Sequence, residues 1–273
     1  MNTNTIGVNS CCHYDLSFIK VLDNYIYFPY YYIEDYYIDV FEYLEIEYDI
    51  IDDDVVRVDK SDISWENLYA IKTESYSACV WYPLLKKYTY SSELIDIYSL
   101  DDIPLVMKNV TFPKFVKLDS VSCKDVHNGI FSSKEEVYEV FKKSKRISNT
   151  LEQSPFSKKS HCLFVRDIDP NIKESLEVRC IVYLSKLVAV SSLLELSKEQ
   201  KYKLENKIAQ IVLDCPYRDS VLDLVIFKDD IKLIEVNNFG ADSPAGAGLF
   251  NWKEDYFILH GGFTEVEYRY GEY

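Results

Sequence analysis

The sequence has few features that break a fold or carry a chain into a membrane. It contains only 8 glycines and 8 prolines among 273 residues, and 48% of its residues are hydrophobic. Such a chain can bury a sizeable core and is not a low-complexity polymer. No run approaches the roughly 18 consecutive apolar residues that span a membrane, and the N-terminus lacks the pattern of a signal peptide. We therefore expect a folded, cytoplasmic protein without a membrane partner.

Positive charge is also scarce. The 30 lysines and arginines are outnumbered by 45 aspartates and glutamates, which gives a formal net charge of −15. Binding to a phosphate backbone normally requires clusters of lysine and arginine, so this charge disfavours nucleic acid as the main partner. An acidic surface favours a basic protein partner, while a cleft on an acidic body can still hold a local positive site.

The cysteines form no recognisable metal or redox motif. They include no C-x-x-C pair, and no histidine stands at zinc spacing from them. We interpret them as reduced thiols, since the alternative of a disulfide scaffold needs an oxidising compartment. The seven cysteines are Cys11, Cys12, Cys79, Cys123, Cys162, Cys180 and Cys215.

Residues 1–74 are unusually rich in tyrosine interleaved with acidic residues. Their aromatic content argues against disorder, and residues 43–50 alternate with the two-residue period of a half-buried strand. We predict a β-containing N-terminal lobe at 1–74 and a nucleotide-binding domain at 75–273. The aromatic stripe can be structural core or a binding face for a basic partner.

The rest of the chain has signals for both helices and strands. Ser133 with Glu136 predicts one helix start, and Ser197 with Gln200 predicts a second helix that ends near Cys215. The gap at 228–230 is too short for a crossover helix, so the flanking strands must form an antiparallel hairpin, which excludes a Rossmann domain here. Apolar or alternating runs predict strands at 163–166, 177–184, 187–191, 221–227 and 231–236.

Three oxygen-bearing side chains converge in this hairpin. Glu235 and Asn237 are two residues apart and leave the same face of their strand. Asp223 shares that face if Leu222, Leu224 and Ile226 pack in the core with Ile234 and Val236. Magnesium prefers oxygen ligands, with phosphate and water completing its octahedral shell. Taken alone, an acid and an asparagine two residues apart on a strand are more typical of a solvated sheet face.

Two cations and a further acid add to this pattern. Glu177 and Arg179 share a face of another predicted strand, and Lys117 lies in a strand-like run. Lysine and arginine that face carboxylates suit a magnesium-bound polyphosphate, since metal and cations share its negative charge. The alternative is a surface pair between glutamate and arginine, which contributes little to stability.

These residues carry a resemblance to the cell division cycle protein 123 family. The match covers about residues 76–255 and depends on the order and spacing of several short segments. They are residues 78–85 (ACVWYPLL), 117–125 (KLDSVSCKD), 177–180 (EVRC), Asp223 on its strand, 233–240 (LIEVNNFG) and 249–252 (LFNW). The resemblance implies an α+β, ATP-grasp-like, two-lobed fold with antiparallel sheets, to which the tyrosine-rich, β-containing N-terminal extension is added.

The resemblance also implies the ligands, ATP and magnesium, and the residues that hold them. It assigns metal binding to Asp223, Glu235 and Asn237, and no residue is assigned a catalytic role. The ATP contacts fall on Lys117, Arg179 and Glu177, on Asp119, Val121 and Ser122 along the nucleotide, and on Arg166, Asp167 and Ile168 at the adenine-side connection between lobes.

The sequence departs from the family pattern at several positions. Glu235 stands where the family usually has aspartate, and Leu193 stands where it has a basic residue near the phosphates. The small-residue segment 240–248 lacks the Gly-Lys-Ser/Thr of a P-loop, and we interpret it as a mobile loop over the site. The first 74 residues match nothing in the family.

The resemblance implies an ATP-binding assembly factor that helps the gamma subunit of translation initiation factor 2 join its partners. An alternative is an ATP-dependent ligase that activates a carboxylate for attack by an amine, because ATP-grasp proteins generally do so. A nucleic-acid ligase is a third candidate, disfavoured by the net charge.

Overall fold

The computed structural model describes residues 20–22, 25–29, 47–51, 55–59, 61, 76–118, 121–153, 161–170, 175–228, 230–241 and 245–272. The chain divides into two compact units. The larger unit combines Met1–Ser75 with Glu174–Tyr273, and the smaller unit is Tyr76–Lys173. The division into residues 1–74 and 75–273 remains a prediction from the sequence.

The described N-terminal residues form a small antiparallel sheet, in the strand order β1-β2-β4-β3. A β-containing N-terminal segment is thus confirmed. Only the end of the predicted strand at 43–50 is seen, because residues 43–46 lie outside the described residues. The strands are β1 (Lys20–Leu22), β2 (Tyr25–Pro29), β3 (Tyr48–Ile51) and β4 (Val55–Asp59).

The smaller unit contains a four-stranded antiparallel sheet in the order β5-β8-β6-β7. Its core includes Val116, Leu118 and Leu163 from the strands and Phe141 from a helix, all fully buried. The strand predicted at 163–166 is confirmed as part of β8. The elements are α3 (Ala78–Leu85), η1 (Lys86–Tyr88), β5 (Ser92–Ile97), η2 (Leu100–Asp102), α4 (Ile103–Val106), β6 (Lys114–Leu118), β7 (Ile130–Phe131), α5 (Lys134–Lys143), α6 (Lys145–Gln153) and β8 (His161–Asp167).

Residues 81–83 (Trp-Tyr-Pro) lie on helix α3 and have a structural role. Trp81 is fully buried, and its ring centroid lies 5.9 Å from that of Phe164 on β8. The Tyr82 hydroxyl accepts a hydrogen bond from the Ser92 N–H at 2.7 Å and donates to the Ser92 carbonyl at 3.0 Å. These contacts fix α3 against β5 and β8.

Both helices at the edge of this unit begin at side-chain caps. Ser133 caps α5 by accepting from the Glu136 N–H at 3.2 Å, which confirms the predicted helix start. A capping box would also have the Glu136 carboxylate accept from the Ser133 N–H. Here it accepts from the N–H of the preceding residue, Ser132. At α6, the Asp125 carboxylate accepts from the Ser144 hydroxyl at 2.7 Å and from the Lys145 N–H at 2.8 Å.

The cap at α6 predicts a pH-dependent contribution to stability. The hydrogen bond from Ser144 lowers the pKa of Asp125, because it favours the ionised carboxylate. The pKa of this carboxyl is lower in the folded state than the value of about 4 in the unfolded chain. The ionised carboxylate therefore stabilises the fold at pH values above about 4, and this stabilisation is lost as the pH falls. Asp125→Asn should therefore lower the unfolding temperature at neutral pH, and the difference from the wild type should shrink in acid. Thermal unfolding followed by circular dichroism measures this, with Asp96→Asn, an exposed aspartate on β5, as the control.

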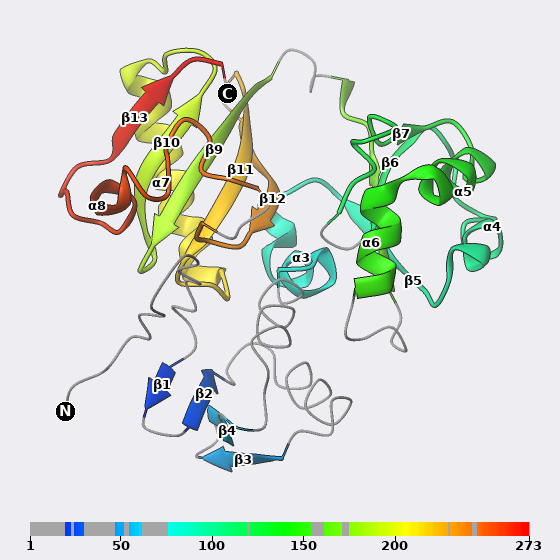
Figure 1. Ribbon diagram of the computed structural model, residues 1–273. Helices are drawn as coiled ribbons and strands as arrows, with labels where there is room; N and C mark the ends of the chain where they lie inside the picture. Colours follow the sequence, from blue (N-terminus) through cyan, green and yellow to red (C-terminus); the bar gives the residue numbers. More distant parts are fainter. Residues whose placement is uncertain are drawn as a thin grey trace. The chain divides into compact units, whose positions relative to one another are not determined.

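The larger unit is built on a five-stranded sheet in the order β12-β11-β9-β10-β13 (Figure 1). All neighbours are antiparallel except β13, which pairs parallel with β10. The predicted hairpin is confirmed as β11 and β12. The bounds are β9 (Leu176–Tyr183), β10 (Lys186–Ser192), α7 (Lys198–Asp214), β11 (Ser220–Phe227), β12 (Asp230–Asn237), α8 (Tyr256–Leu259) and β13 (Glu267–Tyr270).

Helix α7 begins at the predicted capping box and buries one apolar face. The Ser197 hydroxyl accepts from the Gln200 N–H at 3.2 Å, and Gln200 accepts in return from the Ser197 N–H at 2.9 Å. Leu204, Ile208 and Ile211 are buried on one face of the helix. The helix ends at Asp214, with Cys215 as its C-cap, as the sequence predicts.

The hairpin contains one irregularity that the alternation rule missed. Asp223 pairs with Glu235, but the next residue, Leu224, pairs with Leu233, so Ile234 is an extra residue in β12. Leu233 is fully buried whereas Ile234 is half-buried. The sequence predicts Ile234 in the core with Leu224, but a β-bulge gives that place to Leu233.

Among the described residues, cysteines 79, 123, 162, 180 and 215 take part in no disulfide, and burial raises the pKa of the Cys215 thiol to about 12. Among the described helices, none has the length and apolarity needed to cross a membrane.

Candidate functional site

Four predicted site residues lie together on one face of the five-stranded sheet. Arg179 on β9 is the register partner of Asp223 on β11, and Asp223 is in turn the partner of Glu235 on β12. Asn237 lies two residues beyond Glu235, on the same side of the strand. Asp223 is only 4% exposed, and the other three residues are half-buried. The strand register thus brings Asp223, Glu235 and Asn237 to one face of the sheet.

Arg179 and Asp223 form a two-pronged ion pair. The Arg179 Nε donates to Asp223 Oδ1 at 2.8 Å, and Nη2 donates to Oδ2 at 2.9 Å. The remaining guanidinium nitrogen, Nη1, donates to the carbonyl of Ala245. Such paired bonds to a carboxylate fix the orientation of both groups. The sequence assigned Arg179 to phosphate and Asp223 to metal, and in this state the two bind each other.

The donor set around Asp223 fits a magnesium ion. Asp223 and Glu235 supply two carboxylates on one face of the sheet, and carboxylate oxygens are ligands that magnesium prefers. The Asn237 amide nitrogen donates to Asp223 Oδ2 at 3.2 Å, which leaves the amide oxygen as a further acceptor. In the described ranges, no group of three His, Cys, Asp or Glu forms an all-protein metal site.

The thiol of Cys180, the residue after Arg179, is unreactive. Cys180 follows Arg179 and is fully buried on the opposite face of β9. Burial first, and the negative charge of Asp223 second, raise the pKa of this thiol well above its ordinary value. Cys180 stays protonated at neutral pH and is no candidate for a metal ligand or a nucleophile.

In the smaller unit, the predicted ATP contacts Lys117 and Arg166 lie on neighbouring strands. Lys117 on β6 is 4% exposed, and its ammonium lies 5.5 Å from the ring centroid of Phe164. The Arg166 guanidinium lies over the rings of Tyr90 and Phe115, at 5.2 Å and 4.9 Å. Aromatic rings stabilise both cations in their buried positions.

The other predicted ATP contacts have varied surroundings. Val121 and Leu118 exchange two backbone hydrogen bonds, and Val121 packs on the core of the smaller unit. Asp167 is exposed and forms an ion pair with Lys114. Asp119 lies outside the described residues; Ser122 and Ile168 are half-buried in the smaller unit, and Glu177 is exposed on β9 of the larger unit.

Sequence reasoning missed two buried polar residues near the predicted metal ligands. Ser191 on β10 is fully buried and is the register partner of Arg179. Asn238, directly after β12, is 3% exposed, and its amide nitrogen has no hydrogen-bond partner among the described residues. A polar residue inside an apolar strand was a signal for Ser191, but only the strand register shows what it faces.

Leu193 and the small-residue loop complete the surroundings. Leu193 is 52% exposed and directly follows β10. The sequence predicted a mobile loop at 240–248, of which residues 242–244 lie outside the described residues. From Ala245 onward, the backbone is hydrogen-bonded to side chains of β9 and β10.

Comparison with known proteins finds similarity in sequence and in fold. No family model matches the chain. In sequence, it is 27% identical over 250 residues to a putative CDC123-like protein of Acanthamoeba polyphaga mimivirus, with 73% of this chain and 76% of that protein covered. In fold, it matches a C-terminally truncated Cdc123 from Schizosaccharomyces pombe with a TM-score of 0.61 and 20% identity, over 75% of this chain and 98% of that one. A second structure of Schizosaccharomyces pombe Cdc123 matches with a TM-score of 0.57 and 22% identity, over 74% and 97%.

The chain is therefore an α+β protein with mainly antiparallel sheets, as predicted, and its fold matches that of Schizosaccharomyces pombe Cdc123. The agreement of sequence and fold confirms its relationship to the Cdc123 family.

Proposed function

We propose that this protein binds ATP together with magnesium and acts as a Cdc123-type assembly factor. The observation that carries the proposal is the register of three strands, which gathers Arg179, Asp223 and Glu235 on one face. In the proposal, Asp223, Glu235 and Asn237 hold the magnesium ion. Lys117 and Arg179 contact the phosphates. Bound magnesium shares the negative charge of the phosphates.

The chain's own residues have distinct tasks in this proposal. Asp223 holds the guanidinium of Arg179 in a fixed plane, so that one arginine neutralises a buried carboxylate before the ligand arrives. Glu235 is half-buried and carries one methylene more than an aspartate, so it reaches farther from the strand. Asp223 would hold a magnesium ion that binds together with ATP, and Arg179 would then be able to turn a donor toward phosphate.

The proposed partner is the gamma subunit of translation initiation factor 2, or another basic protein. The relationship to Cdc123 and the net charge of −15 support it. In this role ATP is a bound ligand that stabilises the fold by mass action, and turnover is not required. The exposed Leu193, in place of a basic residue, favours binding over phosphoryl transfer.

Calorimetry tests the magnesium dependence. We expect ATP to bind the wild type more tightly with magnesium than without it, because the protein supplies only part of an octahedral shell. The double variant Asp223→Asn, Glu235→Gln should lose this difference. The control is Asp230→Asn, at the exposed end of β12 away from the site. Equal magnesium dependence in the wild type and the double variant would remove the metal assignment.

A second experiment separates the assembly factor from a ligase. The purified protein is incubated with ATP, magnesium and candidate acceptors, and ADP, AMP and covalent products are measured. Capture of the initiation factor subunit without ATP consumption agrees with the proposal. Acceptor-dependent cleavage of ATP that Glu235→Ala abolishes would establish a ligase instead.

A further inference from the structure

A row of polar residues crosses all five strands of the large sheet. The register partners in order are Arg269 on β13, Ser191 on β10, Arg179 on β9, Asp223 on β11 and Glu235 on β12. Register partners on neighbouring strands place their side chains on the same face. We call these five residues the polar row. Two of its members belong to β13 and β10, outside the predicted ATP and metal site.

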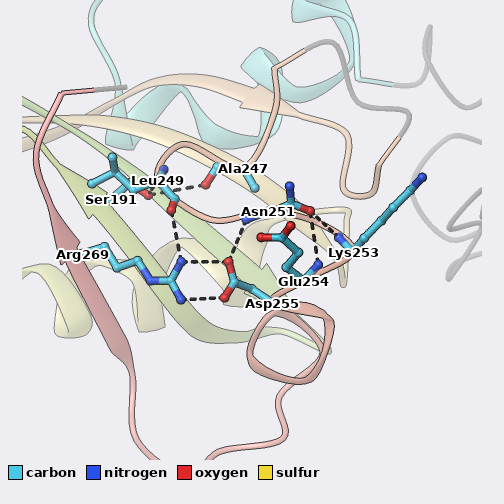
Figure 2. Close-up of polar contacts among 8 residues, drawn as sticks. All are labelled: Ser191, Ala247, Leu249, Asn251, Lys253, Glu254, Asp255 and Arg269. Atoms are coloured by element: carbon cyan, nitrogen blue, oxygen red, sulfur yellow. Dashed lines mark hydrogen bonds and ion pairs between the residues drawn. The ribbon is translucent and has the colours of Figure 1, made fainter.

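The segment 245–249 is hydrogen-bonded along this row. Ser191 binds it twice, since its hydroxyl accepts from the Leu249 N–H at 3.0 Å and donates to the Ala247 carbonyl at 3.4 Å (Figure 2). Arg179 binds it once, through Nη1 to the Ala245 carbonyl. The Arg179 guanidinium that binds Asp223 is thus also hydrogen-bonded to the segment 245–249, which Ser191 binds as well.

Arg269 fastens the other end of the segment. Its Nη1 donates to the Leu249 carbonyl at 3.2 Å, and its guanidinium forms two bonds to Asp255, at 2.8 Å and 2.6 Å (Figure 2). It also lies 4.2 Å from the ring centroid of Phe250. Asp255 accepts in addition from the Asn251 N–H at 2.8 Å. The segment therefore enters and leaves the polar row at fixed points.

The contact between the segment and Ser191 is too close for any side chain in between. A Cβ atom added to Gly248 would lie 2.5 Å from the Ser191 Oγ and 2.7 Å from its Cβ. Gly248 also has φ +68°, a left-handed conformation that glycine adopts without strain. Glycine at 248 is thus what lets the backbone approach Ser191 within hydrogen-bonding distance.

We propose that Ser191 is a positioning residue for the metal site, acting through the segment 245–249 on Arg179 and Asp223. Removing its hydroxyl releases Leu249 and Ala247, and then the Ala245 carbonyl that orients Arg179. Magnesium needs near-ideal octahedral geometry, so a small displacement of Asp223 affects it more than it affects phosphate binding by a flexible cation. The functional consequence depends on the proposed binding of ATP with magnesium.

The test compares Ser191→Ala with the wild type in two measurements. Amide hydrogen exchange without any ligand should show faster exchange at Leu249, whose N–H loses its acceptor. In calorimetry, ATP affinity with magnesium should fall by about 10-fold, which corresponds to the loss of one or two hydrogen bonds. Without magnesium, ATP affinity should stay within about twofold. A general loss of stability would weaken ATP binding to the same extent with and without magnesium.

Ser192→Ala is the matched control. Ser192 is the next residue on β10, is equally buried, and donates one hydrogen bond, to the Leu194 carbonyl at 2.8 Å. Its side chain leaves the opposite face of the strand. It should leave both readouts unchanged, and Ser191→Thr, which keeps the hydroxyl, should restore them. Gly248→Ala is a second variant, which displaces the segment without altering the sheet, and it should act like Ser191→Ala.

An unchanged magnesium effect in both Ser191→Ala and Gly248→Ala would overturn the proposal. If Asp223→Asn, Glu235→Gln abolishes the magnesium effect in the same experiment, only the role of Ser191 is overturned and the metal site stands. A wild-type protein whose ATP affinity does not respond to magnesium overturns both.

Discussion

Asp223→Ala is expected to lower the free energy of unfolding by about 3 to 5 kcal/mol, the usual cost of removing one partner of a buried ion pair. The variant leaves the Arg179 guanidinium, whose side chain is 15% exposed, without the carboxylate that binds two of its nitrogens. Few water molecules can replace that carboxylate at so buried a position. Urea denaturation followed by circular dichroism measures the change.

A double-mutant cycle separates the pair from its two members. Arg179→Ala should also destabilise the fold, because it leaves the Asp223 carboxylate buried. The variant with both changes should lose less stability than the two single losses added together, since no unpaired charge remains. Lys232→Ala with Asp230→Ala, an exposed pair 3.2 Å apart at the far end of β12, provides the comparison and should show little coupling. Additive losses at Arg179 and Asp223 would show that the ion pair does not stabilise the protein.

Lys117→Met is expected to weaken ATP binding by about 1.5 to 3 kcal/mol, roughly 10- to 160-fold in the dissociation constant, the usual worth of a hydrogen bond to a charged group. Methionine keeps an apolar stem near Phe164 and removes the ammonium, so the fold should survive. Isothermal calorimetry with magnesium gives the affinity, and circular dichroism verifies the fold.

Two comparisons sharpen this result. Lys108→Met removes a charge from an exposed position of the same unit and should leave ATP affinity unchanged. Arg179→Ala should weaken ATP to a similar extent as Lys117→Met. If Lys117→Met unfolds readily but binds ATP normally, then Lys117 is a structural residue whose cation stabilises the smaller unit.

Local signals in the sequence predicted the elements that local chemistry determines. Ser197 and Gln200 exchange hydrogen bonds within four residues of each other, so the start of α7 could be read directly. The hairpin of β11 and β12 followed from a gap too short for any other connection. The common face of Asp223 and Glu235 followed from the same hairpin.

Contacts between distant segments could not be predicted in the same way. The parallel pairing of β13 with β10 joins residues that lie almost eighty positions apart, and no local pattern specifies such a partner. The ion pair between Arg179 and Asp223 depends on β9 lying next to β11, so both residues could be singled out while their bond could not. Ser191 was missed for the same reason.

The bulge at Ile234 has a consequence for how the hairpin can change in length during evolution. Ile234 has no partner on β11, whereas the residues on either side of it are paired in register. Loss of this single residue would restore regular pairing on both sides and leave Glu235 and Asn237 opposite the same positions of β11. Loss of any paired residue nearer the end of β12 would instead turn one part of the strand over, moving side chains from one face to the other. Position 234 is thus where the hairpin tolerates the loss of one residue without disturbing the carboxylates.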